Sequence, residues 1–262
     1  MRAIWSGSLS FGLVNIPVKL FSGTQQHELN FDMLAKKDMA PIRYARISTS
    51  SNKEIPWKEI VKGIEITKGK YVVVTEEDFA KASPEKSRAI DILQFVQEKE
   101  IDPIYYDKPY YLTPDKGADK SYFLLLRALE QSKKVALAEF MLRNRNHVCA
   151  VKPYNGVLLL DQMRYQSEIR EVPEIPDAKK SKLSPKEIDL ALKLIDQLTD
   201  TFNPAAFKDT YVESLKKIIE AKAAGKKIAA PVERKTTADV KDLMSVLKQS
   251  LSKSTSSKRK VA

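Results

Sequence analysis

The chain contains little cysteine and histidine, with one cysteine and two histidines among 262 residues. Cys149 cannot form an internal disulfide, and a single cysteine in an apolar run suits a reducing compartment. Because the only histidines are His27 and His147, the sequence offers no set of zinc ligands. We therefore expect neither a metal site nor a cofactor.

Long apolar runs are also missing. No stretch approaches the roughly 20 apolar residues that a membrane-spanning helix needs. Near the amino terminus the only early positive side chain is Arg2, and Ser and Gly residues interrupt the apolar ones, which argues against a signal peptide. We expect a cytoplasmic protein with no membrane partner.

Common catalytic motifs do not occur either. The eight glycines form neither GxGxxG nor GxxxxGK[ST], and GxSxG and HExxH are absent. On a strand, His147 and Cys149 would point the same way, but no third group is in place to orient them. These absences favour a binding protein over an enzyme. The carboxylates Glu98, Glu100 and Asp102 leave a nuclease or ligase as the enzymatic alternative.

The net charge of +11 is concentrated in two segments. Lys36–Lys70 has nine Lys and Arg residues against four acidic ones, a net charge of +5. Lys226–Ala262 has ten against three, a net charge of +7, which leaves −1 for the rest of the chain. Such segments can attract a polyanion, although solvated basic faces remain the alternative.

The first 22 residues predict β-structure with an interruption. Apolar residues alternate with polar ones on both sides of Gly12, but the phase slips by one residue, which predicts a bulge or sharp bend between Phe11 and Asn15. We expect a pair of core strands, with Pro17 at an edge or a strand end. The core residues expected here are Phe11, Leu13, Ile16 and Val18.

The middle of the chain is rich in strand patterns. The basic segment is predicted to be a long hairpin-like excursion with turns at 56–59 and 67–70, followed by a helix that starts at Thr75. A helix is expected over Asp119–Gln131, with Tyr122, Leu125, Leu126 and Leu129 on its apolar face. Strands are expected over 42–47, 64–66, 71–74, 90–96, 101–112, 135–142, 148–151 and 157–160.

The pattern changes after Arg170, where a charged linker with several prolines begins. Ser184-Pro185-Lys186-Glu187 predicts a capped helix start, and a second helix is expected over Thr210–Ala224 with Gly225 as its C-cap. Each helix has an apolar stripe that needs a surface to pack on, and that surface can belong to another chain. A third apolar stripe occurs within 240–251.

Several stretches together resemble one family, the bacterial form of Ku, which binds DNA ends in non-homologous end joining. The matching motifs are MRAIWSGSLSFGLVNIPVKL, EKSRAIDI, EIDPIYYDKPYYLTPDKG, VALAEFMLRNRNHVCAVKP and LSPKEIDLALKLIDQL. The resemblance runs in order over nearly the whole chain to Leu251. One departure is that Ser48-Thr49-Ser50-Ser51 stands where many relatives carry CxxC, so no metal or thiol role is carried over.

The resemblance implies a mainly β, α+β fold. It consists of a Ku-type seven-stranded β-barrel core, a projecting strand bridge, a C-terminal helical arm and a flexible basic tail. The implied domains are a core over 1–176 with its DNA-encircling bridge at about 36–75, a linker over 177–182, a dimerisation arm over 183–225, and an extension over 226–262 with a short helix at 240–251.

The implied function is sequence-independent binding of double-stranded DNA ends by a homodimeric ring that recruits an ATP-dependent, multifunctional DNA ligase. The cytoplasmic location would then be on the nucleoid. The alternative is a side-on architectural DNA-binding protein driven by the basic tail.

Basic side chains in the bridge and barrel-turn segments of the matching motifs are the expected DNA contacts. They are Lys19, Arg43, Arg46, Lys53, Lys58, Lys62, Lys68, Lys70, Arg143 and Arg145. The ligase is expected to bind the third apolar stripe or the end of the arm. The residues of that stripe are Val240, Leu243, Met244, Leu247 and Leu251.

Overall fold

A computed structural model describes the chain except for residues 26–28, 83–87, 144, 176–183 and 227–262. The chain divides into two units, Met1–Glu171 and a second that starts at Val172. The expected linker at 177–182 and almost all of the expected extension lie outside the described residues.

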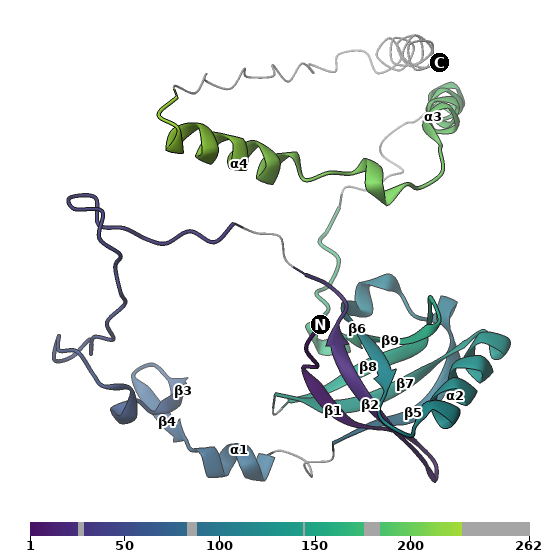
Figure 1. Cartoon of the computed structure of the whole chain (residues 1–262), viewed down its shortest axis with the longest axis horizontal. Helices are drawn as coiled ribbons and strands as arrows, with labels where there is room; N and C mark the ends of the chain where they lie inside the picture. Colours follow the sequence, from purple (N-terminus) through teal and green to yellow (C-terminus); the bar gives the residue numbers. More distant parts are fainter. Residues whose placement is uncertain (26–28, 83–87, 144, 176–183, 227–262) are drawn as a thin grey trace. The chain divides into compact units, whose positions relative to one another are not determined.

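Seven strands of the first unit form a closed barrel (Figure 1). Neighbouring strands pair antiparallel, except that β1 and β5 pair in parallel and so close the barrel. The expected seven-stranded core is confirmed. In barrel order the strands are β1 (Trp5–Phe11), β2 (Val14–Ser22), β6 (Tyr106–Pro114), β9 (Val157–Met163), β8 (Arg145–Tyr154), β7 (Lys134–Leu142) and β5 (Ala89–Gln97).

One end of the barrel is closed by helix α2 (Asp119–Ser132), which follows β6. Its expected apolar face is buried and belongs to the same core as the inward-facing residues of the strands. The Tyr122 hydroxyl donates to the carbonyl of Leu112 at 2.6 Å and accepts from the amide of Leu158 at 2.7 Å. These two bonds tie the helix to β6 and β9.

The phase slip near Gly12 is the turn of a β-hairpin. Gly12 and Leu13 connect β1 to β2, and Gly12 has φ of 56°, a left-handed conformation that glycine adopts without a Cβ penalty. The predicted bend is correct, but the prediction that Leu13 belongs to the core is wrong, because the turn leaves its side chain fully exposed. Pro17 lies within β2, next to Val18, where the ladder with β6 ends. A proline is tolerated there because its missing N–H falls outside that ladder.

Phe11 packs against the core, and Ile16 and Val18 are buried in it, as expected. The strand expected over 101–112 starts later, at Tyr106, because Pro103–Tyr105 forms the short 3-10 turn η3. The 3-10 turns η2 (Glu98–Glu100) and η4 (Gln166–Glu168) follow β5 and β9.

The excursion, residues 29–82, has regular structure only in its second half. That half contains η1 (Trp57–Glu59), β3 (Lys62–Thr67), β4 (Lys70–Val74) and α1 (Glu76–Ala82). The strand expected over 42–47 does not form. Only two isolated β-bridges occur, Leu34↔Pro41 and Ile47↔Glu54, because each closes a tight local turn and leaves no continuous partner strand. The expected turn at 67–70 does connect β3 to β4.

The second unit contains α3 (Pro185–Leu198), the 3-10 turn η6 (Pro204–Ala206) and α4 (Thr210–Ala223). The predicted cap of α3 is confirmed: the Ser184 hydroxyl accepts from the amide of Glu187, whose carboxylate accepts from the amide of Ser184. Gly225 takes the expected left-handed conformation after α4. No residue of either helix is buried. None of the helices in the described ranges has the length and apolar composition needed to cross a bilayer.

Candidate nucleic-acid interface

Two tight turns organise the first half of the excursion. In one, Met39 has φ of 56° and its amide donates to the carbonyl of Ala35. In the other, Asn52 has φ of 53° and its amide donates to the carbonyl of Ser48. Backbone hydrogen bonds within each turn fix its shape, while its side chains stay exposed except for the half-buried Ala35 and Ser48.

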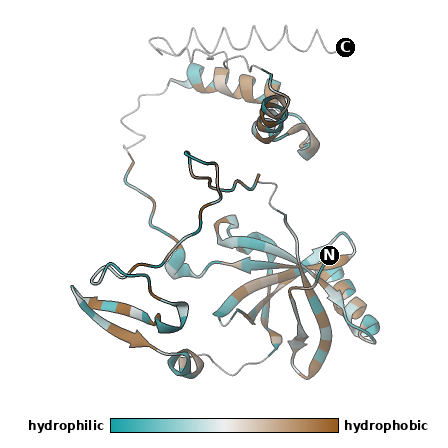
Figure 2. Cartoon of the chain, turned by 60° about the vertical axis from the view of Figure 1, so that its left-hand side comes forward, coloured by the Kyte–Doolittle hydropathy of each residue, from teal (hydrophilic) through white to brown (hydrophobic). Residues whose placement is uncertain are grey.

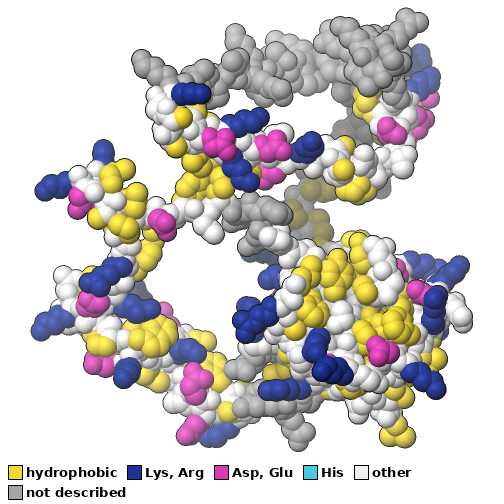
Figure 3. Space-filling model, viewed as in Figure 1, with side chains coloured by type: hydrophobic (Ala, Val, Ile, Leu, Met, Phe, Trp, Pro, Cys, Tyr) yellow, Lys and Arg dark blue, Asp and Glu magenta, His cyan; other side chains and the backbone are white. Residues whose placement is uncertain are grey.

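Most of the predicted DNA-contacting side chains of the excursion are exposed and unpaired. Lys and Arg side chains are spread along it in the space-filling view (Figure 3). Five of these cations have no acidic partner within ion-pair distance among the described residues. An exposed cation without a partner can neutralise a phosphate without first breaking an ion pair. The five are Arg43, Lys53, Lys58, Lys68 and Lys70.

The other two cations of the excursion are held in place. The Arg46 guanidinium lies 4.4 Å from the centre of the Trp57 ring, a cation–π contact that preserves its charge. Lys62 Nζ lies 3.2 Å from a carboxylate oxygen of Glu76 and 4.9 Å from the centre of the Phe79 ring. Lys62 is therefore the most engaged of the seven predicted residues in this segment.

The small sheet of β3 and β4 presents apolar side chains on both faces, and Figure 2 shows hydrophobic residues on its two strands. Ile64 lies opposite Val72 on one face, while Tyr71 and Val73 lie on the other, and all four are more than half exposed. An isolated two-stranded hairpin is marginally stable in water. This sheet therefore needs a further surface to cover it.

Lys19 is the predicted contact that the barrel engages most directly. Its ammonium group lies 2.6 Å from Asp115 Oδ1, and this hydrogen bond lowers the pKa of Asp115. The pair joins β2 to the chain just after β6. Because Lys19 already has an anionic partner, it is the weakest of the candidate DNA contacts on the barrel.

Arg143 and Arg145 lie at the connection between β7 and β8, at the end of the barrel opposite α2. Arg143 has φ of 51°, a left-handed backbone conformation that residues other than Gly, Asn or Asp adopt only at a cost in free energy. Neither arginine has an acidic partner within ion-pair distance in the part of the chain that the structure describes. Both line the same hollow of about 800 Å³.

The structure gives no sign of a reactive thiol at Cys149. Its side chain is fully buried, and burial raises the pKa of the thiol. Burial also lowers the pKa of His147, which lies two residues before it on β8. The cysteine is therefore kept as an unreactive thiol within the core.

The serine turn likewise offers no metal ligands. The hydroxyls of Ser48 and Ser50 lie 3.0 Å apart and hydrogen-bond each other, and Ser51 donates its amide to the Ser48 hydroxyl. Within the described ranges, no group of three or more His, Cys, Asp or Glu residues could hold a metal ion.

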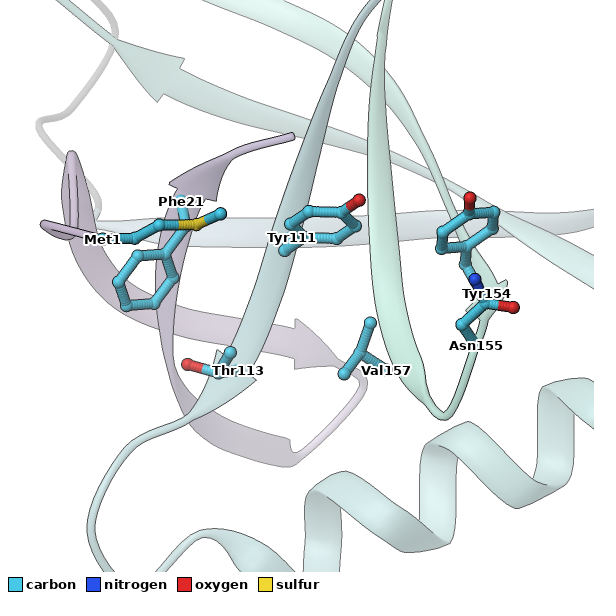
Figure 4. Close-up of a pocket in the computed structure, with 7 residues that line it drawn as sticks. All are labelled: Met1, Phe21, Tyr111, Thr113, Tyr154, Asn155 and Val157. Atoms are coloured by element: carbon cyan, nitrogen blue, oxygen red, sulfur yellow. The ribbon is translucent and has the colours of Figure 1, made fainter. Parts of the chain in front are cut away.

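An apolar hollow of about 470 Å³ lies on the outer surface of the barrel. Phe21 of β2, Tyr111 of β6 and Tyr154 of β8 line it, with Met1 beside Phe21 (Figure 4). The rings of Tyr111 and Tyr154 stack with their centres 6.3 Å apart. Lining by exposed and half-buried aromatic side chains is typical of a surface that binds another protein segment.

The predicted ligase-binding residues Val240, Leu243, Met244, Leu247 and Leu251 all lie outside the described residues. Lys108 was not predicted, yet it lines the hollow with Arg143 and Arg145. Its place could have been found from β6, where Lys108 continues the alternation of Leu112 and Tyr110.

A family model described as the Ku70/Ku80 beta-barrel domain matches residues 10–190. The Non-homologous end joining protein Ku of Opitutus terrae is 42% identical over 256 residues, which are 96% of this chain and 91% of that protein. The protein of the same name from Archaeoglobus fulgidus is 39% identical over 96% of this chain and 98% of its own length. The protein of the same name from Coxiella burnetii is 35% identical over 98% of this chain and 97% of its own length. Among solved structures, the SPOC domain of human PHD-finger protein 3 covers 62% of this chain and 95% of its own at 11% identity, with a TM-score of 0.29, too low to inform the fold.

Proposed function

The chain belongs to the Ku family, and on that basis we propose that it binds double-stranded DNA ends, irrespective of sequence, in non-homologous end joining. The five exposed cations of the excursion without acidic partners carry this proposal. They can contact the sugar-phosphate backbone, which carries no sequence information, whereas base edges would have to be read within a groove.

The DNA-binding form we propose is a homodimer that closes a ring around the duplex. Support comes from surfaces that one copy leaves uncovered. The residues Ile188, Leu192, Ile195 and Leu198 of α3 are each about half exposed or more. Such a continuous apolar stripe on an amphipathic helix is usually buried against a partner. The two faces of the β3–β4 sheet and the apolar hollow at Tyr111 are further surfaces that a second copy would cover.

Recruitment of an ATP-dependent DNA ligase is the second part of the proposal. The apolar stripe within 240–251 is the candidate surface, because such a stripe between polar, low-complexity sequence is typical of segments that fold on a partner. The end of the arm is the other candidate. DNA binding in a bacterial cell would place the protein on the nucleoid.

The ring is tested by comparing a linear duplex with a covalently closed circle of the same length. A ring threads onto the linear duplex only, so binding to the linear form should be much stronger at equal salt concentration. Equal affinity for the two forms would contradict the ring. Ends with 5′-hydroxyl groups should be used, so that threading is measured without a terminal phosphate.

The alternative, side-on binding driven by the basic tail, rests on the net charge of +7 over Lys226–Ala262. Deleting this segment separates the two functions. A ring should keep its preference for linear DNA after the deletion, whereas a protein that binds through its tail should lose nearly all affinity. If the truncated protein binds neither linear nor circular DNA, the result supports side-on binding through the tail.

A further inference from the structure

The inward-facing residues of the barrel change character along its axis. In a barrel, every second residue of a strand points inside. On β6 the inward row runs from Leu112 through Tyr110 to Lys108, and on β9 it runs from Leu158 through Leu160 to Gln162. Towards the end away from α2, the rows thus leave the apolar core and become polar.

Strands β8 and β2 follow the same change. On β8, Cys149 is fully buried, and the next residues on its face are His147 and then Arg145. On β2, Leu20 is buried and Ser22 comes next. The barrel is therefore closed by α2 at one end and open at the other. There, polar side chains line a hollow of about 800 Å³ together with the apolar Ile4, Trp5 and Leu142.

The charge of this open end is one-sided. Lys108, Arg143 and Arg145 line the hollow, and no acidic residue does. Two acidic side chains, Asp107 and Glu168, line an adjoining hollow that shares Arg145, His147 and Gln162, and neither forms an ion pair with Arg145. Asp107 pairs with Arg164 at 2.7 Å, and Glu168 accepts from the amide of Tyr165 at 2.8 Å.

The size of the hollow selects the kind of anion. A space of several hundred Å³ is typical of sites for small ligands. A duplex, whose major groove alone is about 12 Å wide, cannot enter it, so a phosphate in the middle of a strand can meet only its rim. A phosphate at the end of a strand or on a free nucleotide can enter.

Charge and hydrogen bonding match such a terminal group. A phosphate monoester carries a charge of about −1.5 to −2 at pH 7, more than the single charge of a backbone phosphodiester. Arginine forks bind its oxygens in pairs, and three cations that form no ion pair among the described residues suit a dianion. Gln162, Ser22 and Thr24 add neutral hydrogen-bonding groups around the hollow.

We propose that the open end of the barrel is a binding site for a phosphate monoester, held by Lys108, Arg143 and Arg145. The two sources with this chemistry are the 5′-terminal phosphate of a DNA end and a small phosphate such as a 5′-mononucleotide. The first source rests on the proposed DNA-end binding, whereas the second does not.

The test is calorimetric titration of the full chain with five probes. They are inorganic phosphate, deoxyadenosine 5′-monophosphate, deoxyadenosine, and a short duplex with 5′-phosphate ends or with 5′-hydroxyl ends. Deoxyadenosine should not bind. If the mononucleotide or inorganic phosphate binds and the two duplexes bind equally well, the source is a small phosphate. If the duplex with 5′-phosphate ends binds more tightly than the duplex with 5′-hydroxyl ends, the source is the DNA end. If the small phosphates do not bind and the two duplexes bind with the same affinity, the proposal is wrong.

Arg145→Gln and Lys108→Gln, each made separately, locate the site. Each should raise the Kd for the phosphate probe by about tenfold, the loss of roughly one charge-assisted contact. Lys120→Gln on α2, at the closed end, is the matched control and should leave this Kd unchanged. Thermal melting followed by circular dichroism shows whether each variant is folded. Equal Kd values for wild type, Arg145→Gln and Lys108→Gln would overturn the proposal.

This outcome is separate from that of the ring. The preference of the wild-type chain for linear over circular DNA is measured with 5′-hydroxyl ends, which present no monoester. A chain that binds the phosphate probes but does not prefer linear DNA would keep the barrel site and lose the ring. The reverse result would keep the ring alone.

Discussion

The tip of the β3–β4 hairpin provides a quantitative test of DNA binding. Lys68 and Lys70 flank Gly69 in this turn, are exposed, and have no acidic partner among the described residues. The double change Lys68→Gln and Lys70→Gln removes two charges without altering Gly69, whose left-handed conformation the turn requires.

The expected effect follows from counterion release. Each neutralised phosphate contributes about 0.9 to the slope of log K against log salt, so the loss of two contacts should make the slope shallower by about 1.8. Relative to 1 M salt, two contacts correspond to a loss of about 60-fold in affinity at 0.1 M. If both copies in a dimer contact the duplex through this turn, the change in slope should be about 3.6.

Fluorescence anisotropy with a labelled linear duplex measures this slope between about 50 mM and 200 mM salt. Lys62→Gln is the matched control, because Lys62 is already paired with Glu76 and should contribute less. If the double variant keeps the wild-type slope, or changes it no more than Lys62→Gln does, the hairpin tip does not contact phosphates.

Other predictions concern stability, assembly and recruitment. Tyr122→Phe leaves two buried backbone groups without their partner, so the free energy of unfolding in urea should fall by about 2–4 kcal/mol; a fall below about 0.5 kcal/mol would show that the hydroxyl is replaceable. Leu192→Asp with Ile195→Asp places charges on the exposed stripe of α3 and should shift the protein to monomers in analytical ultracentrifugation, while Lys193→Gln on the same helix should not. Leu243→Asp with Leu247→Asp should abolish stimulation of a partner ligase in an end-joining assay but leave binding to DNA ends intact; undiminished stimulation would move the ligase site elsewhere.

Local patterns in the sequence predicted the barrel elements well. The alternation of apolar residues identified the strands, and the apolar face of 119–131 identified the helix that closes the core, because both patterns depend on burial against a single surface. The phase slip at Gly12 also predicted a bend correctly, but the sequence did not show what causes it. A bulge within one strand and a turn between two strands give the same slip, and only the pairing of Phe11 with Val14 distinguishes them.

The excursion shows where such patterns fail. Ile42 to Ile47 was expected to form a strand, yet its backbone hydrogen bonds close two local turns instead. Strand propensity is realised only when a neighbouring strand and a surface to cover are present. Ile42 and Tyr44 are both at least half exposed, so in one copy of the chain neither condition is met there.

Candidate contacts were harder to rank from the sequence, because a count of charges treats all cations alike. The partner of Lys19 is Asp115, 96 residues away, and no local pattern connects them. Lys62 and Glu76 meet only because β3, β4 and α1 follow one another in the fold. These pairings reduce the contribution to DNA binding expected from Lys19 and Lys62. Unpaired cations such as Lys68 and Lys70 are expected to contribute more.

The cations at the open end of the barrel can be located only when the sequence pattern is combined with the order of the strands. Each inward row is visible in the sequence as an alternation, and the rows of β6 and β8 end in Lys108 and Arg145. The order of strands around the barrel, however, places β9 between β6 and β8. That order brings cations separated by more than 30 residues to one rim, with Gln162 between them. A cation at the end of an inward row cannot be buried cheaply without an anion, so a ligand that covers this rim should supply negative charge.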